Sequence, residues 1–272
     1  MSRPAYKLRP TTILDPVPRP DVVPAAGAPE LDAAEAEVFD AAEDDPYYYG
    51  WRYQREISPD GSDRLLWIPL TYQDLLDPQE EDFVAESTLH HSVQGHIAQV
   101  LKRRYQDVPT VAVWSNLKIC LEIPGLTTGP GPDVCVVAGV EDRDRDRTSF
   151  RCGEEPGKVQ LVVEVVSQKS LRKDYQDLLP IYDRLGVEEY FAIRPTGVYA
   201  SGPFELRGWR RETTRKRLRR ILPDQEGRLH SQATGLLFGT GPQGSNLLIW
   251  DATTGERLLT PEEKAAQAQR QA

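Results

Sequence analysis

A chain of 272 residues with 39% hydrophobic and 28% charged residues is long enough for one sizeable domain with appendages. No stretch approaches 18 consecutive apolar residues and the N-terminus has no apolar core, so we expect neither a transmembrane helix nor a secretory signal. The three cysteines form no Cys-x-x-Cys pair, which argues against a zinc site and favours a reducing, cytoplasmic location.

The net charge of −9 is unevenly distributed along the chain. Residues 1–48 carry ten Asp/Glu and four Lys/Arg, are rich in Pro and Ala, and show neither a helical nor a strand period. We interpret them as a disordered acidic arm. The remaining chain is much closer to neutral, so the overall sign does not exclude a nucleic-acid partner.

An aromatic cluster marks the start of the folded body, which we expect to span residues 49–255. Its members are Tyr47, Tyr48, Tyr49, Trp51 and Tyr53. Such a cluster is usually a packing patch. The alternative is a platform on which nucleic-acid bases stack.

A long amphipathic helix is predicted over residues 87–105, because apolar residues recur there at steps of three and four. Ser87 or Thr88 is a suitable N-cap. The histidines of this helix include no metal-binding pair four residues apart, so we expect partly buried helix residues. Extended segments are expected next, at residues 110–114, 118–123 and 134–137.

Residues 158–166 have the pattern of a buried strand, since only Glu164 interrupts the apolar run that ends it. A helix is predicted over residues 172–185, and a further strand over 189–193. Strand, helix and strand in this order imply a crossover and therefore parallel pairing within the sheet. Pro180 removes a hydrogen bond inside the helix, which we expect to be kinked or to begin late.

Short strands and turns are expected beyond Gly197. Near the C-terminus, Thr260, Pro261 and Glu263 have the spacing of a capping box with proline at the first helical position. They predict a polar helical tail within residues 256–272.

Two acids carry the chemistry. Glu164 lies within an aliphatic strand, where a carboxylate must be paired, protonated or bound to a cation. Asp133 follows Pro132 at the start of another strand, so the two side chains can converge on one sheet. Oxygen ligands of this kind suit Mg²⁺. The alternative for a single buried glutamate is an ordinary salt bridge to lysine or arginine.

Three segments, GPDVCVV, LVVEVVSQKS and DYQDLLPIYDRLGVEEYFAIRP, resemble the Uma-type restriction endonuclease family, a branch of the PD-(D/E)XK superfamily. The resemblance covers roughly residues 64–272. It implies an α/β fold with a restriction-endonuclease-like mixed sheet flanked by helices. It also implies hydrolysis of DNA phosphodiester bonds with Mg²⁺ or Mn²⁺. Asp133 and Glu164 would hold the metal together with the backbone carbonyl of Val165, and Glu86 and Asp174 are additional candidates.

The chain departs from the family at its lysine. The superfamily position two residues after Glu164 is Val166, and the alternative position one turn after Asp174 is Leu178. Among the nearby lysines Lys118, Lys169 and Lys173, we expect Lys169 to be the replacement, although a solvated role is commoner for each. Asp174 could equally be a helix N-cap. The competing hypothesis is a catalytically impaired nuclease fold that binds DNA or a protein partner.

A basic cluster over residues 207–220 is the candidate contact to DNA phosphates. The alternative is a solvated charged surface. Separately, the chain is a candidate for forming a homodimer. The members of the cluster are Arg207, Arg210, Arg211, Arg215, Lys216, Arg217, Arg219 and Arg220.

Overall fold

The computed structural model describes residues 45–271 except 58, 60, 85, 121–128, 197–202 and 243–245. Residues 1–44 of the expected arm, and the end of the expected strand at 118–123, lie outside this part of the chain.

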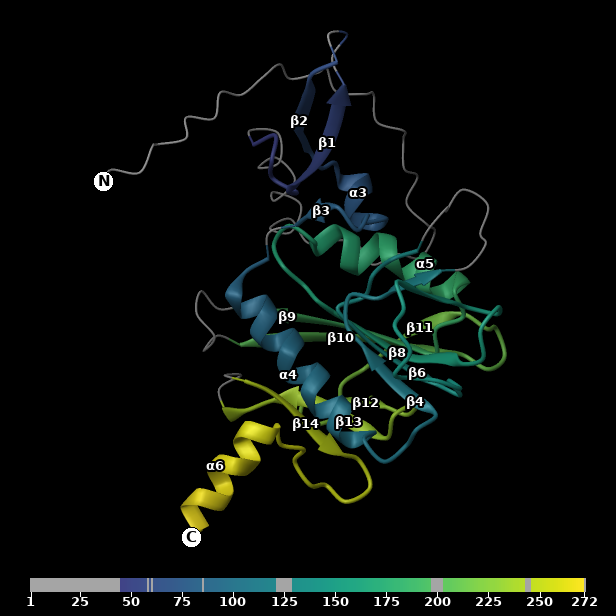
Figure 1. The fold of residues 1–272 in the computed structure, drawn as a ribbon. Coiled ribbons are helices and arrows are strands. Elements are labelled where there is room, and N and C mark those ends of the chain that lie inside the picture. The colour runs from purple at the N-terminus through teal and green to yellow at the C-terminus, as the bar shows by residue number, and fades with distance from the viewer. Residues whose placement is uncertain are drawn as a thin grey trace, which may run out of the picture.

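A six-stranded sheet forms the centre of the molecule, in the order β11-β10-β9-β8-β6-β4 (Figure 1). Strands β8 and β9 are parallel, and every other neighbouring pair is antiparallel. The predicted mixed sheet is therefore confirmed, with its parallel pair at the strand–helix–strand crossover. The strands are β4 (Val111–Trp114), β6 (Val134–Ala138), β8 (Lys158–Val165), β9 (Glu189–Pro195), β10 (Phe204–Arg211) and β11 (Leu218–Ile221).

One face of this sheet packs against helix α4 and a small antiparallel sheet. The helix covers Thr88–Arg104 and begins as predicted, with the Ser87 hydroxyl accepting a 3.1 Å hydrogen bond from the His90 backbone. Its Ile97 and Leu101 are fully buried. The small sheet consists of β12 (Leu229–Ser231), β13 (Leu236–Thr240) and β14 (Leu247–Asp251).

The opposite face is covered by a helix that starts with a π-helical turn, η2 (Lys173–Asp177), and continues as α5 (Leu178–Arg184). The parallel pair β5 (Lys118–Cys120) and β7 (Ser149–Arg151) packs on this face as well. Side chains alternate along β8, so Val163 packs on the α4 side while Val162 packs on the α5 side. Glu164 follows the same alternation and meets the residues of η2 and α5.

The predicted distortion near Pro180 takes the form of the wide turn η2. Pro180 has no N–H, and its ring would collide with the carbonyl four residues earlier in a regular α-helix. The chain accommodates it by widening the preceding turn, as π-turns do in otherwise α-helical segments. The helix then ends as expected at Gly186, whose φ of 76° only glycine adopts without strain.

A separate three-stranded sheet precedes the central one, in the order β2-β1-β3. Figure 1 shows β1 and β2 projecting beyond α3 and α5, away from the central sheet. Its elements are β1 (Trp51–Ile57), β2 (Asp63–Pro69), α3 (Tyr72–Leu76) and β3 (Asp82–Phe83).

The chain ends in helix α6, Pro261–Gln271, opened by the predicted capping box. The Thr260 backbone donates to the Glu263 carboxylate at 3.0 Å, and the Glu263 backbone donates to the Thr260 hydroxyl at 3.2 Å. Among the described residues, no helix combines the length and the apolar character needed to cross a membrane.

Candidate active site

The two predicted acids lie opposite each other on paired strands. Strands β6 and β8 are antiparallel with Val134 opposite Val163, so one step further along the pair Asp133 faces Glu164. Directly opposed residues share a face of a sheet, with Cβ atoms about 5 Å apart. Both are buried, with exposures of 6% and 1%. The Asp133 carboxylate also accepts a 2.7 Å hydrogen bond from the Val165 backbone, which ties the two strand ends together.

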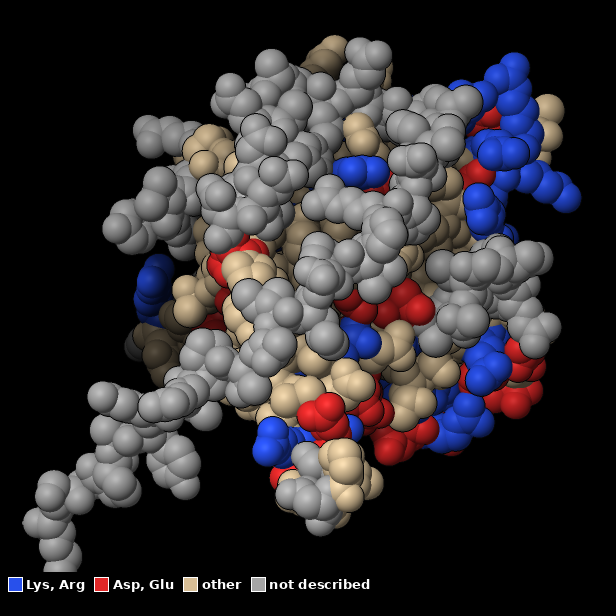
Figure 2. Space-filling model, turned by 90° about the horizontal axis from the view of Figure 1, so that it is seen from above, with Lys and Arg blue, Asp and Glu red and all other residues tan. Residues whose placement is uncertain are grey.

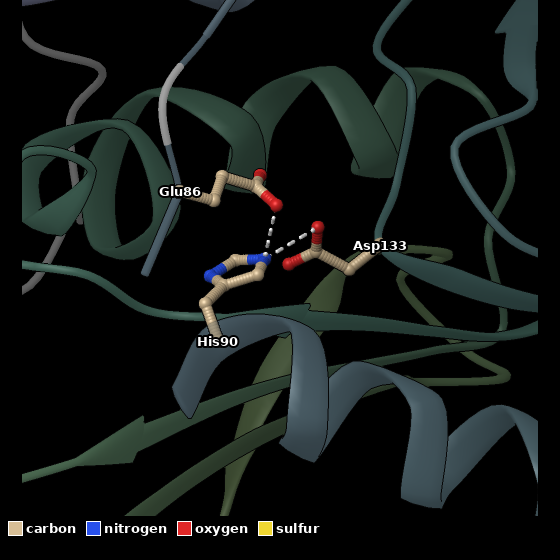
Figure 3. Close-up of side chains that lie close together, drawn as sticks. All are labelled: Glu86, His90 and Asp133. Carbon is tan, nitrogen blue, oxygen red and sulfur yellow. Dashed lines mark hydrogen bonds and ion pairs between the residues drawn. The ribbon is translucent and has the colours of Figure 1, made fainter. Parts of the chain in front are cut away.

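A histidine joins Asp133 at this point. His90 Nε2 lies 3.1 Å from Asp133 Oδ1 and 3.3 Å from Glu86 Oε2 (Figure 3). Helix α4 supplies His90, and the segment just before that helix supplies Glu86. The sequence alone predicts only that His90 is a partly buried helix residue. The signal that could have found it is its spacing of four residues from Glu86.

The three side chains fit a divalent cation. One oxygen or nitrogen atom from each of Glu86, His90 and Asp133 lies within 4.8 Å of the others. Ligands about 2.1 Å from one Mg²⁺ stand up to about 4.2 Å apart, so closing the set around an ion requires less than about 1 Å of movement. Two carboxylates with one imidazole suit Mn²⁺ as well as Mg²⁺, since imidazole favours transition metals.

Glu164 belongs to a second, adjoining group of charges. Its carboxylate accepts a hydrogen bond from the Tyr182 hydroxyl, and its other oxygen lies 3.9 Å from the Lys173 amine. That amine is 3.2 Å from Asp174 Oδ1, while the Ser170 hydroxyl donates to Asp174 Oδ2 at 2.5 Å. None of the hydrogen bonds or ion pairs found for Asp133 or Glu164 involves an arginine in the described part of the chain.

Burial controls the protonation of this group. It raises the pKa of Glu164 well above its usual range; Lys173 opposes the rise, while the charges of Asp133 and Asp174 add to it. It also raises the pKa of Asp174 to about 6, against the opposing effects of Lys173 and the Ser170 hydrogen bond. Burial lowers the pKa of His90, but the hydrogen bond to Asp133 and the charge of Glu86 outweigh this and leave it raised. The site therefore holds protons tightly when no cation is present.

The amine beside the acids belongs to Lys173. A regular α-helix would direct Lys173 about 100° away from Asp174, but in the wide turn η2 the two charged groups meet. The Lys169 amine, which we expected at the site, instead lies 4.9 Å from the centre of the Tyr48 ring. Lys118 pairs with Asp77 at 3.8 Å. Asp174 lies inside the helical segment, where its backbone N–H donates to the Ser170 carbonyl, so it is not an N-cap.

The acids open into a cleft of about 1340 Å³. Its walls come from the segment around β3 on one side and from β5 and β7 on the other. The residues of the site that line it are Glu86, Asp133, Glu164 and Lys173. A ligand in this cleft therefore meets both groups of charges.

The basic cluster shares no residue with the lining of the cleft, and part of it is committed to the fold. Arg210 pairs with the buried Glu189 at 2.6 Å, Arg211 pairs with Asp183 at 3.3 Å, and Arg207 lies over the Tyr175 ring. Figure 2 shows Lys and Arg side chains gathered along the right-hand edge of the face viewed from above. The exposed members of the cluster are Arg215, Lys216, Arg217, Arg219 and Arg220.

In the metal-free protein, stability is expected to fall as the pH rises from about 5 to about 7. Glu164, Asp174 and His90 all have pKa values raised by folding. Their stabilisation is complete below the unfolded pKa values and is lost as the pH passes the folded ones. Melting temperatures in the presence of a chelator would measure this. A melting temperature that stays level or rises across this window would contradict the protonation we assign.

Comparison with known proteins shows the family to which the chain belongs. Residues 80–228 match the model of the Uma2 family, described as "Putative restriction endonuclease". The match spans more than half of the chain, so the chain belongs to this family, and the resemblance inferred from sequence is confirmed. One matching solved structure is described as a "putative nuclease belonging to DUF820" from Anabaena variabilis, with 10% identity and a TM-score of 0.40. That match covers 56% of this chain and 76% of the other. No curated protein matches the chain.

Proposed function

We propose that the chain is a divalent-metal-dependent DNA endonuclease that hydrolyses phosphodiester bonds in the cleft. The observation that carries the proposal is the pair of buried acids, Asp133 and Glu164, opposed on neighbouring strands and open to the cleft. Burying carboxylates without close compensation costs several kcal/mol per ion, roughly. A site that binds a cation explains why this fold retains them.

Asp133 and Glu164 would hold the Mg²⁺ or Mn²⁺ ion, with the Val165 carbonyl as a third ligand. Glu86 and His90 extend this set on the α4 side, where their ligand atoms already approach Asp133. A bound divalent ion polarises a phosphoryl oxygen and lowers the pKa of its water. Tyr182 orients the Glu164 carboxylate by its hydrogen bond, and the Val165 N–H does the same for Asp133.

Lys173 would take the part of the lysine that is missing from the usual position. Its amine is the cation nearest to Glu164 among the pairs described, and it lines the cleft. Asp174 and Glu164 keep it protonated, because their charges outweigh the effect of burial and raise its pKa. A fixed positive charge here would stabilise the negative charge that develops on the phosphate.

The proposal includes a nuclease-like domain at residues 49–255 and a cytoplasmic location, the latter because all three cysteines are free thiols. The exposed basic side chains of residues 207–220 would contact the phosphate backbone away from the cleft. The second candidate function is a nuclease fold that binds DNA without cutting it. Val166 and Leu178, at both positions where the family carries its lysine, favour this alternative.

The test is cleavage of supercoiled plasmid by the wild type with Mg²⁺, with Mn²⁺ or with a chelator. We expect cleavage only with metal, and a loss of at least about a hundredfold in Asp133→Asn. Glu154→Gln, which changes an exposed acid lining the same cleft, is the matched control and should cleave normally. DNA binding without cleavage by the wild type under every condition would support the second function instead.

A further inference from the structure

Four aromatic side chains stand on one face of the N-terminal sheet. Trp51 and Tyr53 come from β1, Trp67 from β2 and Phe83 from β3; we call these four residues the aromatic platform. Residues two apart on a strand share a face, and the register places Tyr53 opposite Trp67 and Trp51 opposite Phe83. The family match begins at residue 80, so most of this sheet lies outside it.

The rings form an open stack. Trp51, on the central strand, is stacked with Trp67 at 5.4 Å between ring centres and with Phe83 at 5.9 Å, and both pairs are within 12° of parallel. Tyr53 meets both outer rings edge-on. The outer rings remain 44% and 48% exposed. Flat aromatic faces left in water gain free energy by stacking on other flat rings.

The rings are the continuous apolar part of this face. Ile57 and Leu65 are also exposed on it, at 71% and 68%, but the charged Arg55 lies between Tyr53 and Ile57 and pairs with Asp63. The exposed rings are therefore the feature that folded domains seldom leave uncovered unless it binds something.

Strand β3 separates the platform from the cleft. Asp82 and Val84, on either side of Phe83, line the cleft, whereas none of the four rings does. Successive side chains of a strand point to opposite faces, so the rings and the cleft lie on opposite sides of β3. Because β3 is at the edge of its sheet and Glu86 follows only three residues after Phe83, a bound strand can reach the candidate metal site by passing around this edge.

Cations lie at the base of this sheet. Lys169 rests on the ring of Tyr48, 4.9 Å from the ring centre. Arg172 rests on the ring of Tyr72 at 5.2 Å and also pairs with Asp177 at 3.2 Å. Lys169 is therefore the cation that a phosphate would meet here. Proteins that bind single-stranded nucleic acids combine aromatic rings, on which the bases stack, with cations that contact the phosphates. A duplex keeps its base faces stacked internally and cannot use such a platform.

We propose that the aromatic platform binds unpaired bases of single-stranded DNA and leads that strand into the cleft. The proposal that the platform binds bases does not depend on the proposed function, whereas the proposal that it delivers the strand for cleavage rests on the proposed function. The platform gives this chain a preference for single-stranded or frayed DNA.

The test compares binding of fluorescent oligo-dT with that of a blunt duplex of the same length, in a chelator. Trp67→Leu and Phe83→Leu keep an apolar side chain but remove the flat ring. Each is expected to weaken oligo-dT binding about tenfold and to leave duplex binding unchanged. Leu65→Ala removes an exposed apolar side chain from the same face and should change neither.

Two outcomes would overturn the proposal. One is oligo-dT affinity unchanged in both folded ring variants. The other is a wild-type dimer that Trp67→Leu dissociates without any change in oligo-dT affinity, which would make the platform a contact between copies of this chain. Asp133→Asn separates the two hypotheses: it should abolish cleavage and leave oligo-dT binding intact. If the wild type cleaves plasmid but its oligo-dT binding does not depend on the rings, the platform proposal is wrong and the endonuclease proposal stands.

Discussion

Replacing Glu164 with glutamine is expected to abolish plasmid cleavage and, at about pH 7.5 without metal, to raise the melting temperature by several degrees. The carboxylate is buried and its pKa is raised well above the usual value, so at neutral pH the fold bears the cost of keeping it protonated or charged. Glutamine has nearly the same shape, can still accept the Tyr182 hydrogen bond, and carries no such cost.

The stabilisation by Glu164→Gln should shrink toward pH 5, because there the glutamate is protonated in the wild type as well. Glu189→Gln is the matched control. Glu189 is equally buried, one strand away, but Arg210 and the Ser231 hydroxyl bind its carboxylate at 2.6 Å and 2.5 Å. Its replacement should lower the melting temperature, since it leaves a charged partner without its counterion. A destabilising Glu164→Gln would mean that Glu164 is a structural acid like Glu189.

Lys173→Met is expected to lower the cleavage rate by about a hundredfold or more, the usual effect of removing one group that stabilises charge in the transition state. It should also destabilise the fold at neutral pH by on the order of a few kcal/mol, because Asp174 and Glu164 lose their nearest cation. Lys158→Met is the matched control. Its exposed amine pairs with Glu188 and lies outside the lining of the cleft, so plasmid cleavage should be unaffected.

A double variant separates the two effects of Lys173. Lys173→Met combined with Asp174→Asn replaces a buried ion pair with neutral groups of similar shape, which is often neutral or stabilising. We expect the melting temperature to recover while cleavage stays low. If cleavage recovers with stability, Lys173 acts only by supporting the fold.

The surroundings of Glu164 could be predicted because they follow from local patterns. A carboxylate inside an aliphatic run signals a buried acid wherever the strand is placed, and the spacing of apolar residues in residues 87–105 defines a helix whatever it packs against. The opposition of Asp133 and Glu164 was also expected, since each lies where a strand begins or ends. The segments around Asp133 and Glu164 also resemble motifs of a known family.

The identity of the neighbouring cation could not be predicted in this way. The sequence shows Pro180 but not how the chain accommodates it, and only the wide turn η2 brings the Lys173 amine against Asp174. Likewise, a count of arginines cannot show that Arg210 and Arg211 are held by Glu189 and Asp183. Sequence determined which residues are costly to bury. The tertiary structure decided which charges offset them, because ion pairs form between side chains that distant segments bring within about 4 Å.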